Sequence, residues 1–227
     1  MKAGRFRPLD PEFDLLHNFL KPGDWALDIG ANVGYYSLRL SELVGPEGRV
    51  IAFEPLSRTV EVLSYCTRYA PHDNITIVQS AVSDKPGILR FTIDTRSDGL
   101  PDYFTARASA SEGKMAIYAT SIDTLALPHR VALAKIDTEG AERFVLRGME
   151  ELIKRDHPVL IVEGDETLEP YLASFGYRMV PRKPPSANLL FLPTASYNSD
   201  SLNLAGMAGQ NAQEANRAPA NSTSRRG

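Results

Sequence analysis

The amino-acid sequence predicts an α/β protein built on a doubly wound, mostly parallel sheet. Three short apolar runs, residues 25–30, 49–55 and 75–79, have the length and composition of buried strands, and amphipathic segments at 35–45 and 57–70 lie between them. Because strands joined by such helices pack side by side in one direction, this order indicates a parallel sheet with helices on both faces.

The second half of the sequence continues the alternation. The expected elements are strands at 131–136 and 158–164, helices at 141–156 and 168–176, and a closing antiparallel pair of strands at 177–181 and 188–193. Apolar residues recur at helical spacing through 141–156, so one face of a long helix should pack on the sheet. Gly148 lies on that face, which predicts a close approach of helix and strand.

The chain divides into four regions by composition. Residues 25–194 should form the α/β domain, and the preceding residues 1–24 contain a helix that begins at Asp10-Pro11, a capping residue followed by a proline suited to the first turn. Residues 94–119 are polar and without clear period, so we expect an inserted flap there. Residues 195–227 are rich in Ala, Asn, Ser and Gln and are predicted to be disordered.

Composition and charge exclude several classes of protein. The net charge of −3 provides no basic surface for nucleic acid, and we expect no nucleic-acid partner. The single cysteine, Cys66, excludes an internal disulfide framework and a cysteine-based zinc site. Since the sequence has neither an apolar run of about 20 residues nor a signal-peptide core, we expect a cytoplasmic protein without a membrane partner.

A glycine-containing turn follows the first predicted strand. In "LDIGANVGYYS", Gly30 and Gly34 lie between strand and helix, where backbone can approach a ligand and the helix offers unpaired N–H groups. Asn32 stands where the dinucleotide-binding fingerprint has its middle glycine, so the turn is not that fingerprint. Asp28 ends the strand, and its carboxylate suits a cationic ligand better than a pyrophosphate.

The second predicted strand ends in another carboxylate, Glu54. A carboxylate at this position can accept hydrogen bonds from both hydroxyls of a ribose. Together with the glycine turn it predicts a nucleoside site. A ligand with a ribose, a positive charge and no phosphate matches S-adenosylmethionine.

Charged residues interrupt and follow the apolar strand 131–136. Lys135 and Asp137 alternate onto the same face, and a buried charge requires a partner. Lys135 could pair with Asp137, with Asp28 or with Glu163 from adjacent strands, either as a structural ion pair or as part of a catalytic site. Glu142 falls in the first helical turn, where negative charge suits the helix dipole.

Four segments, "DIGANVGYYS", "VIAFEP", "AVSDKPG" and "KIDTEGAE", resemble the FkbM-type methyltransferases in order and spacing. The resemblance covers residues 9–193 and implies a Rossmann-like class I fold, S-adenosylmethionine as cofactor, and O-methylation of a hydroxyl on a polyketide, sugar or other small molecule. It also implies that the helix within residues 1–24 caps the site. The residues it implies for cofactor binding are Asp28, Gly30, Asn32, Gly34, Tyr35, Glu54, Pro55, Ser80 and Ala81, with Tyr36 as the alternative to Tyr35 and Asp84 as a further candidate near the adenine.

Methylation of an alcohol requires removal of a proton, to which a positioned base contributes about 10² to 10⁴-fold. Asp137 is the first candidate for this base, Glu139 the second, and Lys135 the third member of the predicted catalytic set. His17, on the N-terminal helix, is a further possibility. We predict no metal site, because no histidine pair or acid cluster has metal-ligand spacing in the sequence and a magnesium site at Asp137 and Asp165 lacks support.

Two alternatives to a small-molecule O-methyltransferase stay open from the sequence. One is a methyltransferase that acts on nucleic acid or protein, against which the weak charge and the absence of an Asn/Asp-Pro-Pro-aromatic motif after the fourth strand both argue. The other is a non-catalytic nucleotide-binding module. Tyr103 and Phe104 in the flap are candidates for contacting a substrate.

Overall fold

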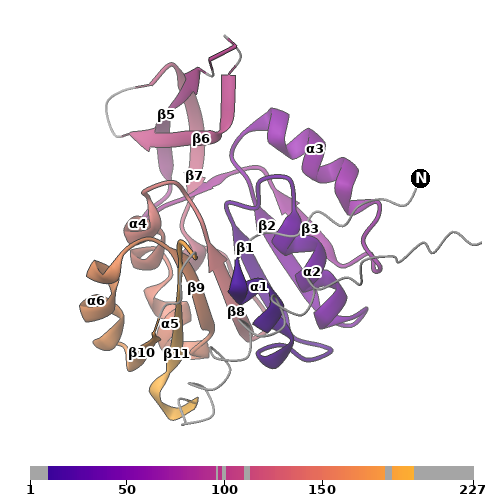
Figure 1. The fold of residues 1–227 in the computed structure, drawn as a ribbon, viewed down its shortest axis with the longest axis vertical. Coiled ribbons are helices and arrows are strands. Elements are labelled where there is room, and N and C mark those ends of the chain that lie inside the picture. The colour runs from indigo at the N-terminus through magenta and orange to yellow at the C-terminus, as the bar shows by residue number, and fades with distance from the viewer. Residues whose placement is uncertain (1–9, 96, 99–100, 110–112, 182–185, 197–227) are drawn as a thin grey trace, which may run out of the picture.

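The computed structural model of the protein describes residues 10–95, 97–98, 101–109, 113–181 and 186–196, without the side chains of 101–107 and 109. Its main sheet has seven strands in the order β10-β11-β9-β8-β1-β2-β3 (Figure 1). The strands are β1 (Trp25–Ile29), β2 (Arg49–Phe53), β3 (Ile75–Val78), β8 (Val131–Ile136), β9 (Val159–Glu163), β10 (Tyr177–Val180) and β11 (Asn188–Pro193).

Strand directions confirm the predicted fold class. Strands β3, β2, β1, β8 and β9 are parallel to one another, whereas β11 runs antiparallel to both β9 and β10. The order reverses between β1 and β8, because β2 and β3 lie on one side of β1 and the later strands on the other. In a parallel sheet of this kind, ligands bind at the carboxyl ends of the strands beside that reversal.

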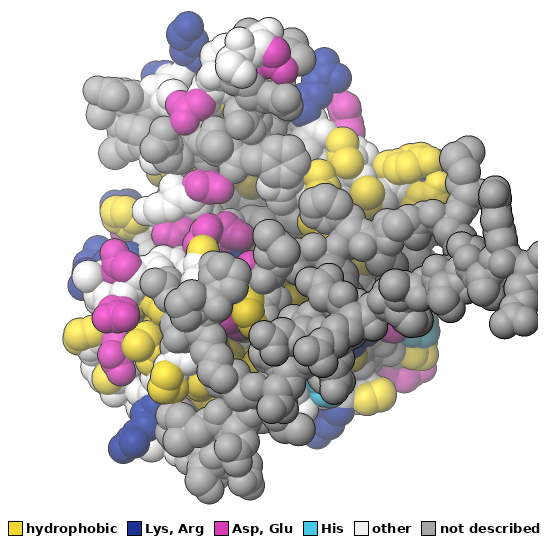
Figure 2. All heavy atoms as spheres, in the orientation of Figure 1, with side chains coloured by type: hydrophobic (Ala, Val, Ile, Leu, Met, Phe, Trp, Pro, Cys, Tyr) yellow, Lys and Arg dark blue, Asp and Glu magenta, His cyan; other side chains and the backbone are white. Residues whose placement is uncertain are grey.

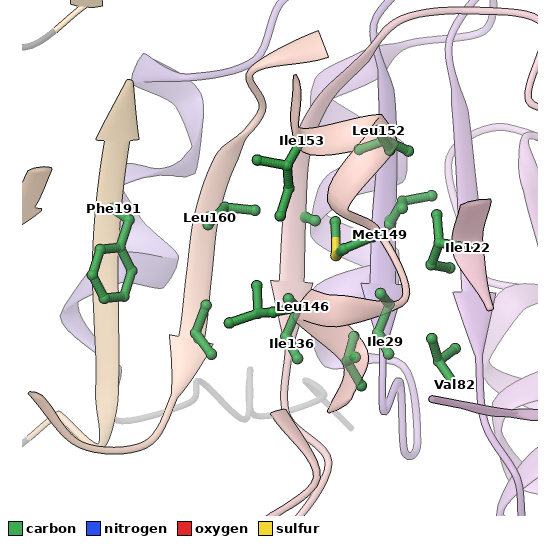
Figure 3. Close-up of a cluster of buried hydrophobic side chains, with 14 of the residues drawn as sticks. Ile29, Val82, Ile122, Ile136, Leu146, Met149, Leu152, Ile153, Leu160 and Phe191 are labelled. Atoms are coloured by element: carbon green, nitrogen blue, oxygen red, sulfur yellow. The ribbon is translucent and has the colours of Figure 1, made fainter. Parts of the chain in front are cut away.

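Helices cover both faces of the main sheet, and each face has its own core. Leu146, Met149 and Ile153 pack with Ile29 and Ile136 on one face (Figure 3). The helices over that face are α4 (Glu142–Arg147), α5 (Glu150–Asp156) and α6 (Glu169–Ala173), with the 3-10 turns η2 (Ile122–Thr124) and η3 (Glu166–Leu168). The opposite face carries α1 (Pro11–Leu15), η1 (Leu16–Asn18), α2 (Tyr35–Val44) and α3 (Ser57–Thr67).

The predicted helix 141–156 is wrong in one respect, because it is two helices with a break at Gly148. A Cβ atom on Gly148 would lie 2.0 Å from the carbonyl oxygen of Ser83, so this position admits no side chain. The Gly148 carbonyl accepts hydrogen bonds from the Ser121 hydroxyl at 2.9 Å and the Asp123 amide at 2.9 Å. The close approach that Gly148 predicted is therefore present, and it interrupts the helix.

The N-terminal helix is shorter than predicted. Regular α-helix covers residues 11–15 only and continues as a 3-10 turn over 16–18, in place of one helix up to the Pro22-Gly23 stop. Leu16 and Leu20 are buried against the sheet, so packing of this short apolar face holds the segment in place.

The flap predicted at 94–119 is not irregular, because it belongs to a second sheet that begins before it, at Ala81. Its strands, β4 (Ala81–Val82), β5 (Gly87–Thr95), β6 (Pro101–Ser109) and β7 (Met115–Thr120), lie in the order β4-β7-β5-β6 and project beyond the end of the main sheet (Figure 1). Tyr103 and Phe104 belong to β6, and their side chains lie outside the described residues.

At its C-terminal end the described chain finishes with the turn η4 (Thr194–Ser196). The predicted disordered tail falls almost wholly on residues 197–227, outside the described residues. Within the described part of the chain, no helix has both the length and the apolar character needed to span a membrane.

Candidate functional site

The glycine turn between β1 and α2 lies at the carboxyl ends of three strands. The amides of Gly30 and Ala31 both donate to the carbonyl of Phe53 at 2.9 Å, which joins the ends of β1 and β2. Gly30 has a φ of +83°, and a Cβ atom there would lie 1.7 Å from the carbonyl oxygen of Asp137. Glycine is therefore required at position 30 by the backbone of β8, as well as by the left-handed conformation.

Gly34 and Asn32 also adopt left-handed conformations. Gly34, with a φ of +95°, is the N-cap of α2, and a Cβ atom there would lie 2.6 Å from the Leu63 side chain. Asn32 has a φ of +49°, a conformation that asparagine tolerates better than most residues. Its backbone amide points to Glu54.

The Glu54 carboxylate is anchored by two backbone amides. Asn32 N–H donates to Oε2 at 3.0 Å and Leu56 N–H donates to Oε1 at 2.9 Å. Burial raises the pKa of Glu54 to about 7, although both hydrogen bonds favour the ionised form. A carboxylate fixed in this way keeps further lone pairs that can accept the hydroxyls of a ribose.

Asp28 lies beneath this turn. Its side chain is buried, accepts a hydrogen bond from the Ser37 hydroxyl, and is absent from the residues that line the adjacent cavity. Burial raises the pKa of Asp28 to about 6, and the Ser37 hydrogen bond and the charge of Lys135 partly offset this rise. The structure therefore places Asp28 as a support for the start of α2, one layer away from the cavity.

Lys135 is a buried cation with a defined partner. Its side chain is 1% exposed, and Nζ donates to Oδ2 of Asp137 at 3.1 Å. Of the partners considered from the sequence, Asp137 makes the hydrogen bond, while Asp28 is the neighbour of Lys135 across the β1–β8 pair. Lys135 itself does not line the cavity.

Three carboxyl groups meet at the ends of β8 and β9. One carboxylate oxygen each from Asp137, Glu139 and Glu163 lies within 4.8 Å of the other two. Glu163 hydrogen-bonds to Asp137 and is partly buried beside its charge, so the pKa of Glu163 is raised to about 8. Burial would raise the pKa of Asp137, but the Glu163 hydrogen bond and the Lys135 charge outweigh it and leave this pKa below its ordinary value.

At neutral pH this pair therefore holds one proton and one negative charge. The lowered pKa of Asp137, beside Lys135, and the raised pKa of Glu163 favour the proton on Glu163 and the charge on Asp137. Acidic side chains gather on this side of the molecule between the small sheet and the main body (Figure 2). Glu139 is exposed, and its φ of +54° is a left-handed conformation outside the range of a regular α-helix.

Glu142 holds the loop that carries Glu139. Its Oε1 accepts hydrogen bonds from the Thr138 amide at 3.0 Å, the Thr138 hydroxyl at 3.1 Å and the Gly140 amide at 3.0 Å. This agrees with the expected structural role at the start of a helix. These three hydrogen bonds to Glu142 therefore hold the loop between β8 and α4 in place.

The small sheet forms a wall of the cavity. Leu89, Phe91 and Ala108 line it from β5 and β6, opposite the strand ends of the main sheet. Ser80 and Ala81 lie at the junction of the two sheets, where the Ser80 hydroxyl donates to the Ala81 carbonyl at 2.8 Å. Asp84, the further candidate near the adenine, is exposed and does not line the cavity.

These elements enclose a cavity of about 290 Å³. The predicted site residues that line it are Gly30, Asn32, Glu54, Pro55, Ser80, Ala81, Asp137 and Glu139. The predicted residues that do not line it are Asp28, Gly34, Tyr35 and Lys135. Tyr35 is 38% exposed, Tyr36 is buried, and His17 is exposed with Nδ1 2.8 Å from the Asp14 carbonyl.

Glu163 is a lining residue that sequence reasoning considered only as a partner for Lys135. It ends β9, and the sheet order places β9 beside β8, so the signal was an acidic residue at a strand end. Asp165, named with Asp137 for a magnesium site, instead accepts from the Thr167 amide at 2.9 Å at the start of η3.

The charged groups that line the cavity fit a nucleoside that carries a positive charge. Its lining includes the carboxyl groups of Glu54, Asp137, Glu139 and Glu163 and, among the described residues, no Lys, Arg or His. Such a lining repels phosphates and favours a sulfonium. Glu54 offers hydrogen-bond acceptors at this cavity, and apolar Phe53, Leu56 and Val82 line it as well.

Fold and site together define a class I, Rossmann-like methyltransferase domain. Residues 28–179 match the family model of the methyltransferase FkbM domain. The chain belongs to this family, which confirms the resemblance of the sequence motifs and S-adenosylmethionine as the cofactor of the domain.

Several known proteins resemble this chain. The crystal structure of a methyltransferase FkbM from Methylobacillus flagellatus KT has a TM-score of 0.55 at 18% identity, covering 81% of this chain and 50% of that one. A putative rRNA-methylase from Clostridium thermocellum has a TM-score of 0.51 at 12% identity, with coverages of 82% and 96%. At these identities the likeness shows the fold alone.

Among curated proteins, a protein-L-isoaspartate O-methyltransferase of Triticum aestivum is 33% identical over 89 residues. The match covers 39% of this chain and 35% of that protein. The chain thus matches about a third of this relative and half of the FkbM structure.

Proposed function

We propose that this protein transfers the methyl group of S-adenosylmethionine to a hydroxyl oxygen of a small molecule. The observation that carries the proposal is the ionised Asp137 at the end of β8, which lines the same cavity as Glu54 and is held by the buried Lys135. In this proposal Glu54 binds the ribose and Asp137 takes the proton of an acceptor alcohol.

The residues of the chain divide the work as follows. The bound cofactor supplies an electrophilic methyl group on a sulfonium. Glu54 binds the ribose hydroxyls, and the turn at Gly30 and Asn32 forms the floor beneath them. Asp137 accepts a hydrogen bond from the acceptor hydroxyl and takes its proton as the oxygen attacks, and alignment of that oxygen provides further rate.

A second hollow offers a place for the acceptor. It measures about 390 Å³ and shares Glu139 and Glu163 with the first cavity, so a molecule lying there reaches the same carboxyl groups. Residues from the β8–α4 loop and from the start of η3 line it, including Gly140, Arg143 and Thr167. The two hollows meet at Glu139 and Glu163, next to Asp137, which lines only the first of them. Adjoining hollows for donor and acceptor suit a two-substrate transfer.

The acidic lining supports a small-molecule acceptor over nucleic acid. Phosphate-bearing polymers require cationic contacts, and the described lining of the first cavity provides carboxylates instead. The second hollow includes one described cation, Arg143, whose guanidinium carbon lies 5.9 Å from the centre of the Tyr171 ring. Ribosomal RNA therefore serves as the contrasting acceptor in an assay.

A transfer assay with labelled S-adenosylmethionine tests the proposal. The acceptor panel should contain neutral, amine-bearing and phosphorylated alcohols and ribosomal RNA, and NMR should locate the methylated atom. We expect methyl ethers of one or more small alcohols. Methylation of RNA or of a nitrogen atom would refute the proposed acceptor, whereas calorimetry that detects NAD binding in place of S-adenosylhomocysteine would refute the cofactor site.

A further inference from the structure

The buried Lys135 has a second neighbour besides Asp137. Its Nζ lies 5.2 Å from the centre of the Tyr36 ring, in the range of a cation–π interaction. A lysine ammonium has three donors, and Asp137 accepts one of them. The ring of Tyr36 therefore faces the cation from α2 on the side away from the cavity.

Tyr36 is itself held by the N-terminal segment. Its hydroxyl donates to Oδ2 of Asp10 at 3.2 Å, and its ring meets that of Phe13 edge to face, with centroids 5.3 Å apart. The ring is 8% exposed, so it has little room to turn. Neither Tyr36 nor the α1 residues line the cavity, which means that α1 does not act as a lid over the described pocket.

The N-terminal segment is tied to the C-terminal strands as well. The Ser186 hydroxyl, just before β11, donates to Oε2 of Glu12 at 2.8 Å, and both side chains are buried. Glu12 also interacts with the charge of Lys135. Asp10 and Glu12 from α1, Tyr36 from α2, Asp28 from β1, Asp137 from β8 and Glu163 from β9 are the titratable groups around this lysine.

We propose that the ring of Tyr36 is a positioning group that fixes Lys135 and through it the catalytic carboxylate of Asp137. A desolvated ammonium without the ring would keep only its attraction to the carboxylates, and it could turn toward Asp28 instead. Asp137 would then lose a fixed hydrogen bond on the side opposite Glu163. The inference rests on the proposed function only in calling Asp137 catalytic. The contacts that lead from Asp10 through Tyr36 and Lys135 to Asp137 do not depend on the acceptor.

Two substitutions at position 36 separate the effect of the Tyr36 ring from the effect of its hydroxyl. Tyr36→Phe keeps the ring face, whereas Tyr36→Met fills similar space with a flexible side chain that has no π face. We expect Tyr36→Met to lower turnover roughly tenfold with an unchanged KM for S-adenosylmethionine, and Tyr36→Phe to stay within about twofold of the wild type. Tyr65→Met, on the exposed face of α3, is the matched control, since Tyr65 is 56% exposed.

Progressively fluorinated phenylalanines at position 36 provide a second test that does not depend on tolerance of methionine. Fluorine keeps the shape of the ring and weakens its negative face, so turnover should fall in step with the number of fluorine atoms. Equal turnover across the series would overturn the proposal, as would a Tyr36→Phe variant as impaired as Tyr36→Met.

Carbon-13 NMR of the Asp137 carboxyl gives a readout without any acceptor. In Tyr36→Met the pKa of Asp137 should rise toward its ordinary value, and in Tyr36→Phe it should match the wild type. An unchanged pKa of Asp137 in Tyr36→Met would refute the positioning role. Absence of methyl transfer by the wild type, together with the expected NMR shift, would refute the proposed function and leave the positioning role in place.

Discussion

A Cβ atom on Gly30 would lie 1.7 Å from the carbonyl oxygen of Asp137. The glycine turn, which forms the floor of the proposed S-adenosylmethionine site, is therefore in direct contact with the backbone of Asp137, the proposed base. A side chain added at Gly30 would therefore displace the backbone of Asp137.

Gly30→Ala should destabilise the protein by about 3 kcal/mol or more, because the new methyl group meets rigid backbone. Gly23→Ala is the matched control, with a φ of +91° and no atom within 4 Å of its Cβ. It should cost about 1 kcal/mol, the conformational strain alone. Urea unfolding of both variants measures the difference, and equal losses would contradict the close contact.

Glu54→Gln should weaken S-adenosylhomocysteine binding by about tenfold or more, since a charged acceptor of hydrogen bonds is lost. The pKa of Glu54 is about 7 in the free protein, so wild-type affinity should rise as pH increases from 6 to 8 and Glu54 becomes ionised. Titration calorimetry across this range checks both statements. The variant should lose the pH dependence, whereas Glu61→Gln, an exposed change on α3, should retain it.

Asp137→Asn should keep S-adenosylhomocysteine affinity and lower methyl transfer by about 10² to 10⁴-fold, because the amide cannot accept the proton. Glu139→Gln, its exposed neighbour, should have a much smaller effect. Steady-state rates together with calorimetry separate chemistry from binding. A larger loss in Glu139→Gln than in Asp137→Asn would transfer the role of base to Glu139.

The raised pKa of Glu163, about 8 against an ordinary 4.5, makes stability depend on pH. Between these values the folded state holds a proton that the unfolded chain releases, so stability should fall as pH rises from about 5 to 8. Solvent screening limits the effect to about 1 kcal/mol. Thermal unfolding of Glu163→Gln, which mimics the protonated group, should lack this slope, and a slope as steep as that of the wild type would refute the assignment.

Asp123→Ala should cost about 1–2 kcal/mol, the value of a helix cap. The Asp123 carboxylate accepts from the Leu152 amide at 2.9 Å and the Glu151 amide at 3.0 Å, and so caps the start of α5. S-adenosylhomocysteine affinity should not change, because Asp123 lies outside the cavity. A loss of affinity would show that the helix break at Gly148 is coupled to the site.

Much of this architecture could be predicted from residue patterns because the main strands are apolar runs bounded by turns. The break within 141–156 could not, since it depends on the Ser83 carbonyl reaching Gly148 from a distant segment. Strands β6 and β7 were missed because the stretches beside them, 96–100 and 110–114, are polar and contain glycine, and the region as a whole has no dominant period. Pairing with β5 stabilises them, and that pairing is not local information.

Some residues of the candidate site could likewise be predicted from the sequence, and others could not. Glu54 and Asp137 end predicted strands, so topology alone brings them to one edge. Asp28 also ends a strand, but its side chain alternates to the face where Ser37 lies and so misses the cavity. The proton shared by Asp137 and Glu163 follows from sheet order and burial, neither of which the residue types specify.

The two-residue strand β4 marks the point where the second sheet begins, and residues 87–120, which follow it, can be regarded as a module. Gly87 and Ala119 pair with each other, so residues 87–120 begin and end at one place beside β4, and they provide the roof of the cavity through Leu89, Phe91 and Ala108. An exchange of this insertion for another of different length would reshape the entrance while the glycine turn and Glu54 stay in place. The roof of the first cavity can thus evolve separately from the proposed acceptor hollow, which no described residue of 87–120 lines.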